Sequence, residues 1–381
     1  MMINHLKLEN WKNFAFVDVD LGRRVFIIGP NASGKSNFLD ALRFLRDVAK
    51  DGLEQAVMTR GGLNSMRHIG ARQRADVSLT VTIDGAWRYS LTVGSERRRP
   101  SPLVVAEVVE KVERSSGAEK WKEILRRPDE NDHDDPARLQ QTALQQVSAN
   151  KDFREIADFF CSIRYRHILP QLMRQPEYFL PNPVSDDPFG RDLVYRIWNT
   201  PEKTRQARLK RINKALQAAV PNFKDLTIEL DAYGSPHFKV NYEPWPPGVY
   251  QNETSLSDGT LRLVAILWSL LEAGGPLLLE KPELALHEGI VAMLPALFAQ
   301  VGKDKTKVGR QVFLTTHAEA MLKDIFIDVS EVLRLEPGPD GVLALNATDE
   351  EIMLMESGLF SAADVLTPKT SPTELESLRF F

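Results

Sequence analysis

The sequence has almost no cysteine: Cys161 is the only one among 381 residues. A single thiol excludes an internal disulfide framework and a zinc site built from several cysteines. Long apolar runs are missing too. No stretch reaches the roughly 18 to 20 apolar residues that cross a bilayer, and the first residues lack the apolar core of a signal peptide. We therefore expect a cytoplasmic protein with no membrane partner.

The chain also lacks an excess of basic charge. It has 48 lysines and arginines against 52 aspartates and glutamates, a formal net charge of −4. No global field therefore attracts nucleic acid, and any contact with DNA must come from a local patch. Heptad repeats of useful length are absent, which excludes long coiled-coil arms. The hydrophobic share of 43% is nevertheless enough for a sizeable core in one large domain or two ordinary ones.

Apolar periodicity predicts two strand-rich parts of the chain. In the first part, strands are expected over residues 3–8, 14–21, 24–28, 77–83, 87–93 and 104–112, with a helix over 37–48. In the second part, strands are expected over 226–230, 237–242, 276–279, 311–315, 332–335 and 342–345, with helices over 260–272 and 284–299. The short all-apolar runs are typical of buried parallel strands, and the alternating runs of half-buried ones.

The stretch between these parts is polar, charged and mostly helical in pattern. Helices are expected over 138–149, 152–162 and 202–219. The acidic run DENDHDD, Asp129 to Asp135, is expected to be a flexible solvated loop. We therefore expect an α/β fold with an N-terminal lobe at 1–100, a mostly helical insertion or lid at 101–225, a C-terminal lobe at 226–345 and a tail at 346–381.

The first motif that carries chemistry is GPNASGKS, Gly29 to Ser36. It follows a predicted strand and opens a predicted helix, which is the context that a phosphate-binding loop requires. Its backbone N–H groups would wrap a β-phosphate, helped by the positive end of the helix. Lys35 would bridge the β- and γ-phosphates of ATP, and the hydroxyl of Ser36 would bind Mg²⁺.

The second motif, LSDGTLR from Leu256 to Arg262, precedes an apolar helix. Ser257 or Asp258 could be an ordinary N-cap, since both residue types cap helices well. The same turn presents a hydroxyl and free N–H groups at a helix start, which suits a γ-phosphate. The residues alone leave both interpretations open.

Two further motifs follow in the second part of the chain. LLLEKPELALHE, Leu277 to Glu288, is an apolar strand whose end carries Glu280 and Lys281. FLTTHA, Phe313 to Ala318, is a strand that ends in His317. Taken alone, a histidine at a strand end is structural more often than functional.

Together these motifs resemble those of ABC-type ATPases of the branch that includes the SMC, RecF and OLD proteins. LSDGT resembles the ABC signature, LLLEKPELALHE the Walker B strand and FLTTHA the switch segment. The resemblance implies an ABC-type P-loop head, in which a mixed β-sheet surrounds the P-loop helix beside an antiparallel β subdomain. Its nucleotide-binding residues would be Gly29, Asn31, Ser33, Gly34, Lys35, Ser36 and Asn37, with Ser257 and Gly259 supplied by a second copy.

The same resemblance assigns the catalytic set. Glu280 would hold Mg²⁺ and His317 would reach the γ-phosphate. Gln171, in ILPQL, would be the glutamine that senses the metal, although Gln175 competes for this role. Lys281 stands at the position of the family's catalytic glutamate.

Lys281 leaves three alternatives for ATP hydrolysis. Hydrolysis is slow, because an ammonium cannot accept the proton of the attacking water. Glu283 or another carboxylate takes over, and turnover is normal. Lys281 turns out to solvent and has little effect. We favour slow hydrolysis, because this position lies close to the γ-phosphate in the family.

The resemblance covers roughly residues 1–100 and 226–345. It implies that two copies hold ATP between them, so we expect a homodimer or a higher homo-oligomer. No TOPRIM nuclease domain follows the last predicted strand, and the chain therefore resembles stand-alone ATPases of the AAA_15/AAA_21 type. Such ATPases are often encoded beside a separate effector, such as a nuclease, in anti-phage defence. The alternatives are a RecF-like ATPase that grips DNA and, less favoured by the PELALH segment, a transporter ATPase.

Three segments outside these motifs have two interpretations each. The basic clusters at Arg205 to Leu216 and at Arg97 to Arg99 are either solvated faces or contacts to DNA phosphates. The apolar tail segment, Glu350 to Leu366, either packs on its own domain or docks a partner or another copy.

Overall fold

The computed structural model describes residues 1–71, 75–96, 101–115, 118–174, 186–301, 310–324, 327–357 and 360–370. The chain divides into two compact units. Unit 1 comprises Met1–Ile163, Gln311–His317 and Ile327–Phe381, and unit 2 comprises Arg164–Arg310 and Ala318–Phe326. The stretch expected as one insertion, 101–225, is therefore shared between the two units. No helix within the described ranges is long and apolar enough to cross a membrane.

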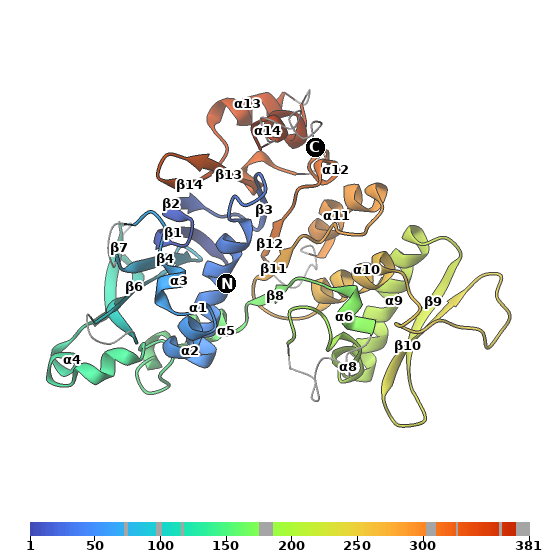
Figure 1. Ribbon diagram of the computed structural model, residues 1–381, viewed down its shortest axis with the longest axis horizontal. Coiled ribbons are helices and arrows are strands. Elements are labelled where there is room, and N and C mark those ends of the chain that lie inside the picture. Colours follow the sequence, from blue (N-terminus) through green and yellow to red (C-terminus); the bar gives the residue numbers. More distant parts are fainter. Residues whose placement is uncertain are drawn as a thin grey trace, which may run out of the picture. The chain divides into compact units, whose positions relative to one another are not determined.

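Six antiparallel strands form one sheet of unit 1 (Figure 1). In spatial order they are β2 (Phe14–Asp20), β1 (Ile3–Trp11), β4 (Val77–Ile83), β5 (Trp87–Ser95), β6 (Pro102–Ser115) and β7 (Ala118–Arg127). Every second side chain of β4 is buried, which is the alternation that the sequence predicts for a half-buried strand. The expected hairpin around Asp84-Gly85 joins β4 to β5.

A second group of strands in unit 1 carries the glycine loop. β3 (Arg24–Ile28) lies between β12 (Val312–Thr315) and β13 (Val332–Gly338), and all three are parallel. β14 (Gly341–Leu345) is antiparallel to β13, which confirms the last predicted hairpin. β12 is wholly buried and β3 nearly so, as expected of short apolar runs in a parallel arrangement.

The helix α1 (Lys35–Asp51) follows β3 and buries one apolar side that includes Phe38, Leu42 and Leu45. The remaining α-helices of unit 1 are α2 (Leu53–Met58), α3 (Leu63–Met66), α4 (Glu130–Asp134), α5 (Arg154–Cys161), α13 (Asp349–Glu356) and α14 (Ala362–Thr370). Three short 3₁₀ helices lie at Pro136–Gln140, Lys151–Phe153 and Val329–Glu331.

Unit 2 combines two short pairs of strands with helices. β8 (Arg164–Arg166) is parallel to β11 (Leu277–Glu280), and β9 (Phe223–Leu230) is antiparallel to β10 (Pro236–Tyr242). Among its described residues, the helices are α6 (Pro170–Arg174), α8 (Leu193–Trp198), α9 (Glu202–Ala219), α10 (Asp258–Leu271), α11 (Glu288–Val301) and α12 (Glu319–Leu322). α9 has the predicted bounds, whereas α11 begins four residues later than predicted because Lys281–His287 forms turns.

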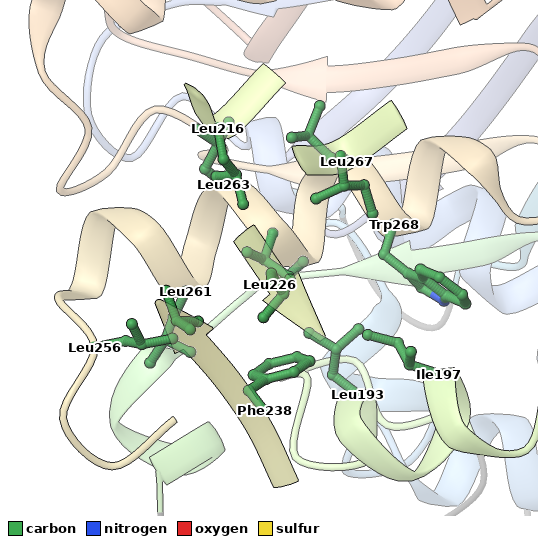
Figure 2. Close-up of a cluster of buried hydrophobic side chains, with 14 of the residues drawn as sticks. Leu193, Ile197, Leu216, Leu226, Phe238, Leu256, Leu261, Leu263, Leu267 and Trp268 are labelled. Atoms are coloured by element: carbon green, nitrogen blue, oxygen red, sulfur yellow. The ribbon is translucent and has the colours of Figure 1, made fainter. Parts of the chain in front are cut away.

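The core of unit 2 surrounds α10, which is apolar on nearly all sides. Figure 2 shows its leucines and Trp268 packed against side chains from α8, α9, β9 and β10. The labelled residues are Leu193, Ile197, Leu216, Leu226, Phe238, Leu256, Leu261, Leu263, Leu267 and Trp268. A helix buried in this way has a fixed N-terminus, and that end carries the LSDGT motif.

The helix expected over residues 138–149 is wrong, and the stretch expected to be mostly helical begins with a strand. β7 is a strand at the edge of the sheet, and most of its side chains are exposed, so charges on both faces hide its alternation. Residues 138–149 form the end of a 3₁₀ helix and then turns. The buried carboxylate of Glu107 accepts the N–H groups of Ala143 and Leu144 at 2.6 and 3.0 Å, and these bonds stabilise the turns in place of a helix.

The acidic run Asp129–Asp135 is also not a flexible loop. It contains α4, and the side chain of Asp132 is buried. The guanidinium of Arg127 donates to both carboxylate oxygens of Asp132, at 2.9 and 2.8 Å. These bonds lower the pKa of Asp132 to about 2. Sequence composition alone could not predict this ion pair, because it depends on how β7 ends beside α4.

The tail packs back on unit 1. Glu351 of α13 accepts hydrogen bonds from Arg334 of β13 and from Lys369 of α14. Ala362 and Leu366 of α14 are buried. Of the two interpretations of this segment, the structure favours packing on its own domain.

Candidate functional site

The glycine loop of unit 1 runs from the end of β3 to the start of α1. Gly34 is the N-cap of α1 and has a φ of 84°, in the left-handed region. A Cβ atom at Gly34 would lie 2.0 Å from Nδ2 of Asn13, so a larger residue does not fit. The amide of Asn37 donates to Oδ1 of Asn13 at 2.8 Å and holds the first turn of the helix against the same residue. The loop therefore needs glycine at this position.

Lys35 lies inside the loop, with only 6% of its surface exposed. Its ammonium donates to the carbonyls of Gly29 and Pro30 at 2.8 and 2.7 Å, and lies 3.4 Å from Oγ of Ser33. These partners are neutral and do not cancel its charge. Ser36 is exposed beside it. A lysine ammonium at the N-terminus of a 17-residue helix brings positive charge to this loop, which suits a polyanion such as a nucleoside triphosphate.

His317 leaves the same edge of the sheet as the glycine loop. β12 pairs with β3 in a parallel register that places Thr315 opposite Ile27. The N–H of Thr316 donates to the carbonyl of Ile27 at 3.2 Å. His317 follows as an exposed residue directly after this pair of strand ends. Unit 1 thus brings together the loop and the histidine that the sequence singles out.

In unit 2, the LSDGT turn forms the N-terminus of α10. The hydroxyl of Ser257 accepts the N–H of Thr260 at 3.2 Å, so Ser257 is the N-cap. Ser257 is exposed. A Cβ at Gly259 would lie 2.7 Å from the carbonyl oxygen of Ala285, so the turn packs directly on the segment that follows β11. The two motifs of unit 2 are therefore in contact.

Gln171 lies at this turn as well. Its amide donates to Oδ2 of Asp258 at 2.7 Å, and Arg174 donates to Oδ1 of the same carboxylate. Gln175, the competing candidate for the metal-sensing glutamine, lies outside the described residues. Gln171 is therefore bound to the LSDGT turn, through its hydrogen bond to Asp258.

Glu280 is held at the end of β11 by the neighbouring strand β8. The hydroxyl of Tyr165 donates to Oε2 of Glu280 at 2.5 Å, and Nδ1 of His167 lies 3.7 Å from Oε1. Burial lowers the pKa of His167, and the charges of Arg262 and Lys281 lower it further, against the opposing effect of Glu280. The cations Arg262 and Lys281 therefore affect His167, the neighbour of this carboxylate.

Lys281 occupies a fixed turn immediately after Glu280. Its φ is 46°, in the left-handed region, and its carbonyl oxygen accepts a hydrogen bond from Nη1 of Arg262 at 3.3 Å. Arg262 is buried, and this burial lowers its pKa, while the charges of Asp258 and Glu283 oppose that shift. The backbone at Lys281 is thus set by a contact that does not depend on its side chain.

The sequence did not predict Tyr165, His167 or Arg262 as members of this site. Tyr165 belongs to a strand of only three residues, which is too short to give a periodicity signal. Arg262 is read from sequence as a polar residue on an apolar helix. Only the pairing of β8 with β11, and the packing of α10 below the turn, reveal their position.

Comparison with known families gives a match over most of the chain. The profile of the AAA_21 family, described as "AAA domain, putative AbiEii toxin, Type IV TA system", matches residues 24–320. No curated protein sequence matches the chain.

Among solved structures, head domains of SMC proteins are similar. An SMC head bound to the C-winged helix domain of ScpA is 13% identical with a TM-score of 0.53, over 93% of this chain and 100% of that chain. An SMC head with an extended coiled coil, bound to the C-terminal domain of ScpA derived from Pyrococcus furiosus, is 12% identical with a TM-score of 0.50, over 94% and 99%. At these identities the likeness concerns the fold alone, and it confirms the predicted class, an ABC-type P-loop head.

Proposed function

The chain belongs to the AAA_21 family of P-loop ATPases, and from this premise we propose that it is a switch that closes around Mg·ATP and opens on slow hydrolysis. Two copies would share each nucleotide. One copy would supply the glycine loop, and its mate would supply the turn that begins at Ser257. The closed pair would control a separate effector protein.

The glycine loop would hold the triphosphate. Lys35 would turn from the carbonyls of Gly29 and Pro30 to the phosphate oxygens, which are stronger acceptors for an ammonium. The N–H groups of Asn31, Ser33 and Gly34 would complete the cradle, and Asn37 would keep the loop anchored on the turn between β1 and β2 through its contact with Asn13. The buried ammonium of Lys35 at the N-terminus of α1 is the observation that supports this assignment.

The hydroxyl of Ser36 would bind the Mg²⁺ that accompanies the triphosphate, with nucleotide oxygens in its shell, and the resemblance to ABC-type ATPases implies Glu280 as a further ligand. Within the described ranges, no group of three or more acidic, histidine or cysteine side chains is arranged to hold a metal ion alone. The ion would neutralise phosphate charge. Tyr165 would orient Glu280 through its hydroxyl, which donates to Oε2. His317, at the edge that carries the loop, would contact the γ-phosphate.

The exposed Ser257 supports a role for its turn in the partner's site. Ser257 lies exposed at the start of a 14-residue helix, where its hydroxyl would turn from Thr260 to a phosphate that another copy carries. Gly259 keeps the turn close to Ala285, so binding there would be transmitted to the segment that follows Glu280. ATP would in this way join two copies.

Slow hydrolysis is proposed because Lys281 follows Glu280 in a turn whose backbone is fixed. A lysine there brings a cation to the place where the attacking water needs a proton acceptor. Arg262, bonded to the carbonyl of Lys281, adds a second cation below the same turn. Glu283 is the carboxylate that could substitute, and a Glu283→Ala variant separates the two cases. If the wild type hydrolyses ATP at an ordinary rate and the Glu283→Ala variant is slower, Glu283 accepts the proton of the attacking water.

The role in anti-phage defence, with a nuclease as effector, follows the resemblance to stand-alone ATPases. The alternative, a RecF-like ATPase that binds DNA, is favoured by the exposed cations of α9, among them Lys210, Arg211 and Lys214. Binding of the isolated protein to duplex DNA discriminates the two proposals. Binding that falls steeply with salt, and is lost when Arg211 and Lys214 are replaced by glutamate, would favour the RecF-like function.

Not all of the α9 cluster is available for such contacts. Arg205 lies over the ring of Trp198 at 4.5 Å, and Arg208 over Trp268 at 5.2 Å. Charge reversal at Arg208 would therefore disturb the core of unit 2 and is a poor test of DNA binding. The second basic cluster, Arg97 to Arg99, lies outside the described residues.

The proposal is tested by the mass of the protein in solution and by phosphate release. We expect a larger species with Mg·ATP than without nucleotide, and slow release of phosphate from it. A protein whose mass is unchanged by Mg·ATP at saturating concentration contradicts the shared site.

A further inference from the structure

Unit 2 carries an open apolar groove between α9 and α11. It consists of two lobes, of about 340 and 450 Å³, which share Ala215 of α9 and Leu297 of α11. The two lobes therefore adjoin along α9 and α11. Leucines of α10, among them Leu263 and Leu267, form its floor, and Figure 2 shows both side chains near Leu216 of α9.

The walls of the groove are built for close approach of another element. α9 contributes Ala215, Ala218 and Ala219, whose spacing places them on one face of the helix. Small side chains of this kind let a backbone come near. On the opposite wall, 59% of the surface of Met293 of α11 is exposed, so this apolar side chain is accessible to a partner.

The length of the groove fits a short helix. From Arg211 to Ala219, the wall on α9 spans about 12 Å at the rise of an α-helix, which is roughly two turns. An amphipathic helix of two to three turns would lay its apolar face along this floor, with its leucines between α9 and α11.

The charge of the rim defines the partner further. Arg211 and Lys214 line the second lobe and are exposed. α9 contains six cationic side chains and a single acidic one, Glu202, at its first position. A helix with acidic residues beside its apolar face would therefore meet opposite charge along α9, whereas a basic helix would be repelled.

We propose that this groove docks an acidic amphipathic helix of a partner protein. The groove is coupled to the motifs of unit 2 by its own residues. Leu263 belongs to α10, whose N-cap is Ser257, and His287, also in the lining, directly precedes α11. A bound helix would fix the position of both elements. Docking requires only the folded unit 2, so it holds whether or not ATP joins two copies.

The test uses the full chain and a synthetic probe. The probe is a fluorescent peptide of about 18 residues, with leucines at helical spacing and glutamates beside them. Its controls are a scrambled peptide and one in which lysines replace the glutamates. Binding is followed by fluorescence anisotropy as protein is added, at low and at high salt.

Three protein variants locate the site. Arg211→Glu with Lys214→Glu reverses the rim charge, and Lys203→Glu with Lys210→Glu reverses two exposed charges of the same helix outside the lining. Ala218→Trp fills the groove with an indole. All three changes lie on the surface of α9, and thermal melting and ATP binding show whether each variant is folded.

We expect the acidic peptide to bind and both control peptides not to bind. Binding of the acidic peptide should be weaker in high salt. The rim reversal should weaken binding about tenfold and the matched reversal less than threefold, because long-range attraction is screened. Ala218→Trp should abolish it. No binding at about 100 µM protein, equal loss in both reversals, or binding that survives Ala218→Trp overturns the proposal. A fall in the protein's mass on Ala218→Trp also overturns it, because a second copy would then be the occupant.

Discussion

Replacing Lys281 by glutamate should accelerate ATP hydrolysis. Glutamate would place a proton acceptor directly after Glu280, where the wild type has an ammonium. A positioned general base contributes about 10²- to 10⁴-fold in rate. Each factor of ten corresponds to about 1.4 kcal/mol, so the carboxylate would stabilise the transition state by about 3 to 6 kcal/mol.

The structure indicates that the substitution leaves the fold intact. The left-handed φ of 46° at residue 281 costs lysine and glutamate about the same, because both carry a Cβ atom. The hydrogen bond from Arg262 goes to the main-chain carbonyl of residue 281 and is retained in the variant. We therefore expect a stability change within about 0.5 kcal/mol, and a changed rate then reports chemistry.

The assay is phosphate release at saturating Mg·ATP, with Lys281→Gln as the matched control. Glutamine removes the cation but accepts no proton, so its rate should stay within about tenfold of the wild type. A glutamate variant no faster than the glutamine variant would refute the reasoning. A wild type that already turns over at an ordinary rate of about 10 per second would refute it as well.

Three further predictions test the loop, the turn and the acidic helix. Lys35→Ala should lower ATP affinity at least about 100-fold by calorimetry, because it removes the buried ammonium; unchanged affinity would reject the loop as the site. Gly259→Ala should destabilise the chain by about 1 to 3 kcal/mol in denaturant melts and impair ATP-dependent association, because its Cβ would lie 2.7 Å from the carbonyl of Ala285. Asp132→Asn should lower stability by about 3 kcal/mol at pH 7, since it breaks the buried pair with Arg127. The pKa of Asp132 is about 2 in the folded chain and near 3.9 when unfolded, so its contribution is present above pH 4 and lost towards pH 2. A wild-type and variant difference that stays constant over this range contradicts the ion pair.

Local pattern was enough to predict much of the fold. The glycine loop lies between a buried strand and an amphipathic helix, and these signals need no tertiary information. α9 likewise has the predicted bounds because Leu209, Ile212 and Leu216 form its one buried face. Elements in strongly charged stretches were missed, because charge hides their apolar pattern. β7 is an exposed edge strand, and α4 lies in an acidic run whose Asp132 pairs with Arg127.

The candidate site was predicted in part for the same reason. The glycine loop could be found because phosphate chemistry needs glycine, lysine and serine at fixed spacing, and the other three motifs through their resemblance to those of ABC-type ATPases. The side chains around Glu280 could not, because Tyr165 and His167 lie more than 100 residues earlier in the chain and reach it only through a parallel strand pair. The turn at Lys281 needs the buried Arg262, which sequence places on an apolar helix without indicating its direction.

The central claim is that one triphosphate is held by the glycine loop of one copy and by the Ser257 turn of another. A structure of the wild-type chain with bound Mg·ATP measures this directly. Slow hydrolysis would help, because the bound ATP would stay intact. We predict that Oγ of Ser257 lies about 3 Å from a γ-phosphate oxygen bound at the other copy's Lys35. A bound nucleotide with Ser257 remote from every phosphate in the assembly would contradict the account.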